Sequence, residues 1–191
     1  METQQTKVRV RLDTYNNSWY NPGAGTLKRV LWFMANALFF INPLNPSSAL
    51  KVSLLRLFGA TVGKDVVIKP GVNIKYPWFL KIGNYAWIGE KVWIDNLAMV
   101  RVGDHATLSQ GALLLTGSHN YKRETFDLRV GQIDLEEGVW IGAKAMVCPD
   151  VICASHSVLT AGSVAVANLD SYTIYQGNPA VAKRKREMES N

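Results

Sequence analysis

Residues 82–99 read IGNYAW IGEKVW IDNLAM, three blocks of six residues that each begin with isoleucine. The fifth residue of every block is alanine or valine, and the second is glycine in two of them. A fixed period of six residues is typical of a β-helix solenoid. In that fold each repeat forms a short strand and a turn, and it buries its apolar side only when neighbouring repeats stack on it. The stretch therefore predicts a solenoid.

The same period continues on both sides of this stretch. VGKDVV and IKPGVN precede it, VGDHAT and LSQGAL follow it, and after an interruption the pattern resumes as LEEGVW, IGAKAM, VCPDVI, CASHSV and LTAGSV. A sandwich of evenly spaced strands is the alternative, but its strands would recur every ~8 to 12 residues. We predict an all-β solenoid over residues 59–170. Three repeats form one triangular coil, so about five coils begin at Val62, Ile82, Val102, Leu135 and Cys153.

Strand alternation predicts which side chains face the core. Positions one and five of each repeat should point inward and position six outward, so the outward residues form three columns, one per face. The first column holds Val67, Trp87, Thr107 and Trp140, the second Asn73, Trp93, Leu113 and Met146, and the third Phe79, Met99, His119 and Ile152. Large apolar side chains on an outer surface need burial elsewhere, and we therefore expect these faces to pack on other subunits.

The chain has three histidines, and one of them stands apart. His105 and His156 occupy the fourth position of their repeats, where polar turn residues are expected. His119 ends a repeat and precedes the interruption at 120–134, and interruptions of that length are usually functional. Spacing alone leaves two roles open for His119, a base and a hydrogen-bonded interface residue. Zinc would need three converging ligands, and we expect no metal because no HxxxH pair is present.

Composition limits the class of protein. The chain has 191 residues, 48% of them apolar, which is enough for one main core. Its net charge of +6 includes a basic cluster at 183–186, but no nucleic-acid motif accompanies it, so we expect a small phosphorylated ligand and no nucleic acid. Two cysteines are too few for a disulfide framework, and the first residues lack the pattern of a signal peptide. We expect a cytoplasmic location.

The first 58 residues do not follow the six-residue period and predict an extension with helices. Residues 30–41, VLWFMANALFFI, are almost entirely apolar but fall short of the ~20 residues that cross a bilayer. This segment either packs on the solenoid or lies in a membrane surface, so peripheral contact with the inner membrane stays open. Residues 48–59, SALKVSLLRLFG, predict a helix that closes the first coil and ends at Gly59. Residues 171–191 form a short C-terminal tail.

Several motifs carry a resemblance to a known family. The six-residue blocks, TGSH at 116–119, VWIGAKAMVCPDV at 139–151 and QGNPAVAKR at 176–184 resemble the hexapeptide-repeat acyltransferases. NNSWYNPGAGTLKRVLWF, LLRLFGATVGKDVVIKPGVNIKYPWFLKIGNYAWIGE and SQGALLLTGSHNY are similar to the colanic-acid biosynthesis acetyltransferase group, over nearly the whole chain. The resemblance implies a left-handed parallel β-helix, a handedness that the general right-handed rule for parallel strands would reject.

The resemblance also implies a reaction. Members transfer acetyl from acetyl-coenzyme A to a sugar hydroxyl, in a homotrimer whose sites lie between subunits; here the sugar would belong to an exopolysaccharide or surface glycan. A histidine side chain can take the proton of a hydroxyl as it attacks the thioester, and His119 matches the family's catalytic histidine. Ala143 matches the oxyanion position, where serine is common, so this chain would offer only a backbone N–H.

Cofactor residues follow from the same resemblance. Trp140 matches an aromatic residue beside the active site, although plain interface packing explains it equally well. Gly142 and Ala161 match backbone positions of later coils that contact the cofactor. Lys183 and Arg184 match basic residues that reach the nucleotide phosphates, with a solvated tail as the alternative. A lysine common after the GAGS segment is absent from AGSVAVANLD, so phosphate binding depends more on the tail.

The acceptor and even the enzymatic role leave alternatives open. A free sugar or the hydroxyl of an antibiotic would undergo the same chemistry as a glycan intermediate. A non-catalytic trimeric scaffold is a further alternative. A scaffold does not require a base before a long loop, so His119 discriminates between a scaffold and an enzyme. Residues 12–25, rich in polar, aromatic and turn residues, could contribute to an acceptor site.

Overall fold

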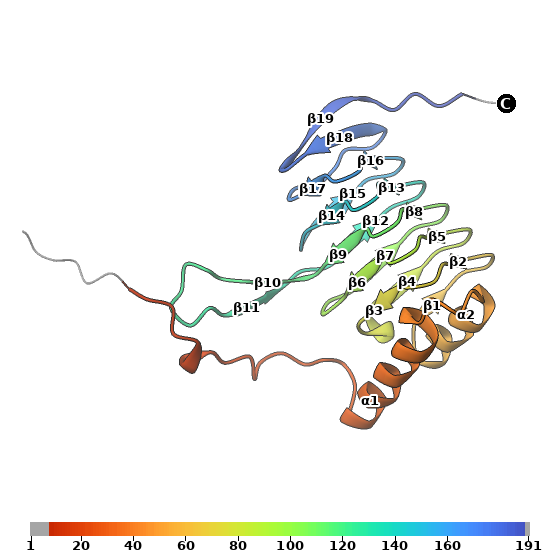
Figure 1. The fold of residues 1–191 in the computed structure, drawn as a ribbon. Coiled ribbons are helices and arrows are strands. Elements are labelled where there is room, and N and C mark those ends of the chain that lie inside the picture. Colours follow the sequence, from red (N-terminus) through yellow and green to blue (C-terminus); the bar gives the residue numbers. More distant parts are fainter. Residues whose placement is uncertain (1–7, 190–191) are drawn as a thin grey trace, which may run out of the picture.

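The structure, a computed structural model, describes residues 8–189 and forms a solenoid of stacked coils (Figure 1). Three parallel sheets make three faces. Face 1 contains β2 (Val67–Ile68), β5 (Trp87–Ile88), β8 (Thr107–Leu108), β13 (Trp140–Ile141), β16 (Val158–Leu159) and β18 (Thr173–Gly177). Face 2 contains β3 (Asn73–Ile74), β6 (Trp93–Asp95), β9 (Leu113–Leu115), β14 (Met146–Val147) and β17 (Val164–Ala165). Face 3 contains β1 (Thr61–Val62), β4 (Leu80–Ile82), β7 (Val100–Val102), β12 (Ile133–Leu135) and β15 (Ile152–Cys153).

The predicted core positions are confirmed. The first residues of the five predicted coils are all buried, and so are the small residues at position five of nearly every repeat. Ile68, Ile88 and Leu108 stack along the inside of face 1 without solvent exposure. Each such aliphatic side chain contributes about 1.5–3 kcal/mol when fully buried. Stacking of one coil on the next therefore supplies the burial that a single repeat lacks.

Two of the three predicted outward columns are also confirmed. On face 1 the parallel register aligns Val67, Trp87, Thr107 and Trp140. On face 2 it aligns Asn73, Trp93, Leu113 and Met146. Trp87, Trp93 and Trp140 remain exposed in the single chain, so faces 1 and 2 present large apolar side chains outward.

The third predicted column is wrong except at Ile152. Face 3 aligns Thr61, Lys81, Arg101, Asp134 and Ile152, and Arg101 forms an ion pair of 2.8 Å with Asp134. The reason is that two extra residues precede Ile82 and Val102 and lengthen the strands, which makes Lys81 and Arg101 the outward neighbours. Phe79 instead lies in a short 3-10 helix, η3 (Pro77–Phe79), and Met99 precedes β7. His119 leaves the solenoid altogether.

His105 and His156 are turn residues, as expected. Both lie at corners between strands with positive φ angles of 56° and 60°. The His105 ring stacks on Tyr85, and the His156 ring lies beside Tyr172 of the next coil. These contacts support corner packing.

The N-terminal helices close the first coil. The described extension contains η1 (Leu12–Thr14), α1 (Thr26–Ala35), a π-helical segment η2 (Asn36–Ile41) and α2 (Ser48–Leu57); residues 1–7 of the predicted 1–58 extension lie outside the described residues. Polar side chains of these helices bond to each open edge strand: Arg56 to Val62 O of β1, Ser48 and Lys51 to Ile68 O of β2, and Trp32 to Ile74 O of β3. The open edge of a solenoid would otherwise present unpaired backbone groups. The predicted closing helix is thus present, and it ends two residues before Gly59.

The other end of the solenoid is closed by a strand of its own. β18 pairs parallel with β16, and β19 (Ala180–Lys185) folds back antiparallel on β18. Much of the segment predicted as the tail 171–191 therefore lies in a sheet; residues 190–191 are outside the described part. Within residues 8–189, no helix is both long and apolar enough to cross a membrane.

Candidate active site

A hairpin carries His119 away from the solenoid. The interruption between coils forms β10 (Gly117–His119) and β11 (Leu128–Val130), paired antiparallel with His119 opposite Leu128. Figure 1 shows this hairpin projecting sideways from the stacked coils. Its end is fixed by a hydrogen bond of 2.8 Å from Asn120 N–H to the Asp127 carbonyl. The predicted functional interruption is therefore an ordered arm, and coil geometry resumes at Ile133.

The His119 ring has one bonded nitrogen, and no residue among 8–189 bonds to the other. Nδ1 lies 2.9 Å from the carbonyl oxygen of Phe126, and a carbonyl can only accept, so Nδ1 carries the proton. In the neutral ring Nε2 then keeps its lone pair. The Phe126 ring stacks on the imidazole with centroids 4.3 Å apart and an interplanar angle of 8°. The hairpin thus holds the histidine in the tautomer that a general base requires.

The N-terminal segment runs along the hairpin before it reaches α1 (Figure 1). Arg11 N–H donates to the Glu124 carbonyl at 2.8 Å, and the Tyr15 ring lies 5.8 Å from the His119 ring. Further along, the Tyr20 hydroxyl donates to Leu97 O at 2.7 Å. Burial and the nearby Tyr76 and Asp95 raise the Tyr20 pKa, so this hydroxyl stays protonated and remains a donor. The segment 12–25 therefore forms a wall beside His119.

A groove of about 500 Å³ lies between this segment, the hairpin and the first coils. Its lining includes His119, Tyr15, Tyr20, Arg29, Lys75 and Tyr76. We call it the His119 groove. A second, more apolar hollow of about 390 Å³, lined by Trp32, Phe33 and Trp93 among others, shares Arg29, Lys75 and Tyr76 with it. The two hollows therefore meet at a pair of basic residues.

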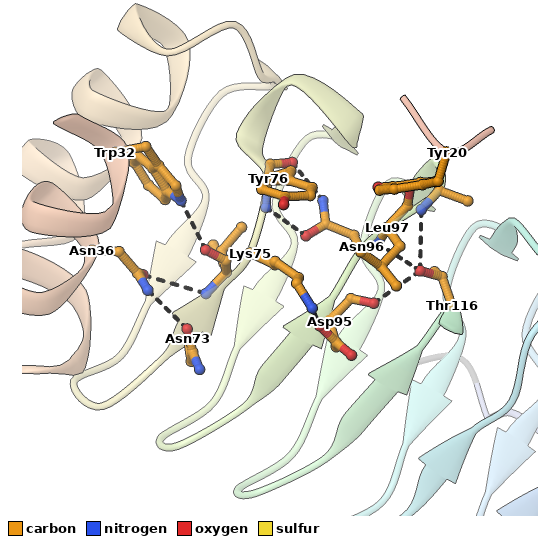
Figure 2. Close-up of polar contacts among 12 residues, drawn as sticks. Tyr20, Trp32, Asn36, Asn73, Lys75, Tyr76, Asp95, Asn96, Leu97 and Thr116 are labelled. Atoms are coloured by element: carbon orange, nitrogen blue, oxygen red, sulfur yellow. Dashed lines mark hydrogen bonds and ion pairs between the residues drawn. The ribbon is translucent and has the colours of Figure 1, made fainter. Parts of the chain in front are cut away.

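Figure 2 shows Lys75 and Asp95 pointing toward each other, and Lys75 lines both hollows. Lys75 Nζ is 2.9 Å from Asp95 Oδ1, and Asp95 is largely buried. Despite that proximity, Asp95 Oδ1 accepts no well-aligned hydrogen bond from the described residues, and the buried Nε of Arg29 has no acceptor among them either. A buried N–H without an acceptor costs about 1–3 kcal/mol, so the Arg29 Nε suits a polar ligand. Our sequence analysis missed Arg29, Lys75 and Asp95.

A separate groove contains most of the predicted cofactor residues. Trp140, Gly142, Ala143 and Ala161 line a hollow of about 300 Å³ together with Ser109 and Thr160. Trp140 Nε1 donates to Ser109 Oγ at 2.9 Å, which fixes the indole on one wall. We call this hollow the Trp140 groove.

The backbone of the Trp140 groove offers two free donors. Among the described residues, neither the Ala143 N–H nor the Ala161 N–H has an acceptor. The Gly142 N–H, by contrast, already donates to Leu159 O at 2.7 Å. Gly142 is needed for close packing, because a Cβ there would lie 2.5 Å from Ala161 N. Ala143 and Ala161 can therefore donate to a ligand, whereas Gly142 can offer only its carbonyl and its small size.

Lys183 and Arg184 lie in strand β19 and are exposed. They line a shallow hollow of about 260 Å³ with Asp170 and Thr173. The neighbouring Lys185 and Arg186 are engaged instead: Lys185 Nζ donates to Thr173 Oγ1, and Arg186 donates to Gly138 O and His156 O. The two predicted phosphate-binding residues are thus the ones left available in this strand.

One chain does not bring the predicted residues together. The His119 groove, the Trp140 groove and the β19 hollow share no lining residue. His119 lies on an arm that extends outward, whereas the Trp140 groove lies on the solenoid itself (Figure 1). A complete site would need the arm of one copy to meet the Trp140 groove of another.

The cysteines are not suited to nucleophilic chemistry. Burial raises the pKa of Cys153 to about 12 and also raises that of the half-buried Cys148. A thiol with a raised pKa is mostly protonated at neutral pH, and the thiolate is the nucleophile. Across residues 8–189, no three or more His, Cys, Asp or Glu side chains are grouped to hold a metal ion.

Comparison with known proteins places the chain among acetyltransferases. No protein-family profile matches it. "Putative colanic acid biosynthesis acetyltransferase WcaF" of Escherichia coli (strain K12) is 36% identical over 164 residues, which cover 86% of this chain and 90% of WcaF. The galactoside O-acetyltransferase of the same strain is 26% identical over 146 residues, 74% of this chain and 72% of that protein.

Solved structures share the fold. A hexapeptide-repeat acetyltransferase of Vibrio cholerae, crystallised with acetyl-coenzyme A, matches with a TM-score of 0.77 at 23% identity, covering 87% of this chain and 92% of that chain. The fold is a left-handed parallel β-helix: the six-residue period predicted the solenoid, and the family resemblance implied its handedness.

Proposed function

Because the chain belongs to the family of hexapeptide-repeat acetyltransferases, we propose that it moves the acetyl group of acetyl-coenzyme A to a sugar hydroxyl. The Vibrio cholerae acetyltransferase was crystallised with acetyl-coenzyme A, and a galactoside acetyltransferase was solved with coenzyme A. The name of WcaF refers to colanic acid biosynthesis. The acceptor proposed here is accordingly an intermediate of an exopolysaccharide or surface glycan.

The hydrogen bond from His119 Nδ1 to the Phe126 carbonyl is the observation that carries this proposal. It leaves Nε2 free to take the proton of the acceptor hydroxyl while the hydroxyl oxygen attacks the thioester carbon. The tetrahedral intermediate carries an oxyanion, to which the free Ala143 N–H would donate. Collapse expels the coenzyme A thiolate, which recovers the proton from His119. The products are the acetyl ester of the sugar and free coenzyme A.

The sugar would occupy the His119 groove. Arg29 Nε has no acceptor among the described residues, and the Asp95 carboxylate, paired with Lys75, lines the adjoining hollow; hydroxyl groups can bond to both. Lys75 and the Tyr20 wall add further polar contacts near the same point. Bonds to charged groups contribute about 1.5–3 kcal/mol each, enough to orient one hydroxyl toward Nε2.

Acetyl-coenzyme A would occupy the Trp140 groove. The free N–H groups of Ala143 and Ala161 can bond to carbonyl groups of the pantetheine arm, and the Trp140 ring can pack on it. Lys183 and Arg184 lie in β19, three strands along face 1 from β13, and would meet the nucleotide phosphates. No metal is required by this chemistry.

A homotrimer would complete the site. The His119 arm and the Trp140 groove share no lining residue within one chain, so each arm would reach the groove of a neighbour. Faces 1 and 2 carry the exposed tryptophans, whereas face 3 carries Lys81 and the Arg101–Asp134 ion pair. Apolar faces suit subunit contacts and the charged face suits solvent. We place the reaction in the cytoplasm.

Mass spectrometry of reaction products tests the proposed reaction. The protein would be incubated with acetyl-coenzyme A and three acceptor classes: free sugars, antibiotics with free hydroxyls, and glycan intermediates from cells. We expect a mass increase of one acetyl group on a glycan intermediate, with coenzyme A released in equal amount. Transfer to a free sugar or antibiotic alone would replace the proposed acceptor. No transfer to any acceptor, with acetyl-coenzyme A left unbound, would favour a scaffold.

A further inference from the structure

Helix α1 and the following segment η2 carry a second apolar face that no described residue covers. Leu27, Val30, Leu31, Met34 and Leu38 recur with helical spacing and form what we call the outer stripe. These side chains are 50–73% exposed. We propose that the outer stripe docks the protein on an anionic lipid bilayer. This proposal goes beyond the acetyl transfer and does not depend on it.

The opposite face of the same helix is already occupied. Trp32, Asn36 and Phe40 are buried against the first coil, where Trp32 bonds to Ile74 O and Asn36 to Asn73. The solenoid therefore needs only one side of α1 and η2. A helix that is apolar on both sides is normally buried on both, and an amphipathic helix at a membrane lies with its apolar face in the interface.

The outer stripe continues beyond α1. Ile41 and Leu44, which follow along the chain, are 45% and 86% exposed. Figure 1 shows α1 and α2 on the outside of the first coils, at the end of the solenoid opposite β18 and β19. Monomers rarely expose contiguous apolar surface of this extent without a partner. Docking through this end would leave the later coils and the Trp140 groove away from the lipid.

The charge of the N-terminal region indicates which partner the outer stripe binds. Residues 14–64 contain no Asp or Glu but five basic residues, Lys28, Arg29, Lys51, Arg56 and Lys64. Lys51 is buried and bonded to backbone carbonyls, and Arg56 bonds to Val62 O and Gly63 O, whereas Lys28 and Lys64 are exposed. Anionic lipids attract such a basic, apolar surface.

A second copy of this chain is a poorer partner for the same surface. Symmetric contact would bring two acid-free basic surfaces together, and like charges in contact are unfavourable. The exposed tryptophans of faces 1 and 2 already offer subunits a surface without that penalty. Charge complementarity therefore favours the bilayer.

Vesicle sedimentation of the full chain tests the proposal. Vesicles of phosphatidylcholine with phosphatidylglycerol would be compared with vesicles of phosphatidylcholine alone, at low and high salt. We expect binding to the anionic vesicles, weakened by salt. The double variant Leu31→Glu/Met34→Glu should bind at least ~10-fold more weakly, because it removes apolar area and adds repulsion.

A matched double variant controls for general effects. Val166→Glu/Val181→Glu changes two side chains that are 56% and 52% exposed, close to the 50% of Leu31 and 54% of Met34, but at the far end of the solenoid. Both double variants add the same negative charge, so both should lose a little affinity for anionic vesicles. Apart from that small loss, we expect Val166→Glu/Val181→Glu to bind these vesicles as the unchanged protein does. Equal loss in both doubles, or no binding by the unchanged protein, would overturn the proposal.

Sedimentation velocity without lipid shows whether the outer stripe binds a bilayer or a second copy of the chain. The outer-stripe variant should keep the oligomeric state of the unchanged protein. A smaller assembly would identify the stripe as a subunit contact and overturn the bilayer proposal. Acetyl transfer to an acceptor free in solution should be unchanged in this variant, so a failed docking proposal and a failed acetyl-transfer proposal give different results.

Discussion

The six-residue coils and the arm that interrupts them are stabilised by different interactions. In the coils, each inward residue is covered by its counterparts one coil before and after, as Ile88 is by Ile68 and Leu108. In the arm, β10 and β11 pair with each other, the turn between them bonds to Arg11 through Glu124 O, and the side chains of both strands remain partly exposed. Burial therefore fixes the coils, whereas a few directed bonds fix the arm.

The difference explains why the chemistry is carried by the arm. A coil position is constrained to be apolar inside and to match its neighbours in register, so it has little freedom to present a base. The arm is free of that constraint and holds His119 by the Phe126 carbonyl and ring. Two histidines of the same chain, one in each environment, allow a direct comparison.

His119→Ala should have the largest effect on catalysis. Loss of a general base costs ~10²- to 10⁴-fold in rate, and we expect at least ~100-fold with the fold unchanged. His105→Ala is the matched control, since His105 occupies a coil corner and stacks only on Tyr85. Steady-state kinetics of the two variants measure the contrast. Equal rates for both variants would remove the base assignment.

A charge on an outer column should break the assembly. Met146→Glu places a carboxylate on face 2, where subunit contact would bury it without a partner, at a cost of about 3–5 kcal/mol. Ile152→Glu makes the same kind of change one repeat later but on the charged face 3. We expect sedimentation to show smaller species only for Met146→Glu, together with lost activity. The reverse pattern would place the contact on face 3.

Asp95→Asn should affect the acceptor and spare the donor. The change removes a buried charge at the centre of the polar cluster, and losing a bond to such a group costs about 1.5–3 kcal/mol. We expect the KM for the acceptor to rise ~10-fold or more, with the KM for acetyl-coenzyme A unchanged. Asp134→Asn, which also removes the carboxylate of an ion pair but on face 3, should alter neither. A rise in the KM for acetyl-coenzyme A would move Asp95 to the donor site.

Replacing Lys183 and Arg184 together by alanine should have the smallest effect of this series. If both meet phosphates, coenzyme A binding weakens by about 1–3 kcal/mol at low salt and by less at high salt. Lys81→Ala/Arg101→Ala removes the same charge from face 3 and controls for long-range electrostatics. Calorimetry that finds equal affinities for the two doubles would make β19 a purely structural strand.

Periodicity predicted the coils well because burial repeats in the sequence. The inward positions and two outward columns follow from a spacing of six and from strand alternation. The third column failed at Leu80–Lys81 and Val100–Arg101, where two extra residues per coil lengthened the strand instead of the corner. The sequence alone does not show whether two extra residues lengthen a strand or the corner before it.

The site was only partly predictable for a related reason. His119, Trp140, Ala143 and Ala161 were found because they match motifs, but their separation into two grooves is a property of the fold. Arg29, Lys75 and Asp95 come from three distant stretches and have no shared motif, so only their contact in space reveals them. One sequence signal pointed to Asp95. It is acidic and follows the core residue Ile94 directly, a position at which most repeats have no acidic residue.

Subunit complementation tests most directly whether the arm of one copy serves the groove of another. His119→Ala copies keep an intact Trp140 groove, and Ala161→Trp copies, with that groove filled, keep an intact arm. Each variant alone should be nearly inactive. Trimers that contain both variants, purified through two different tags, should regain activity at about one third of their sites if each arm meets one neighbour's groove. Mixed trimers no more active than either parent would contradict a site shared between subunits.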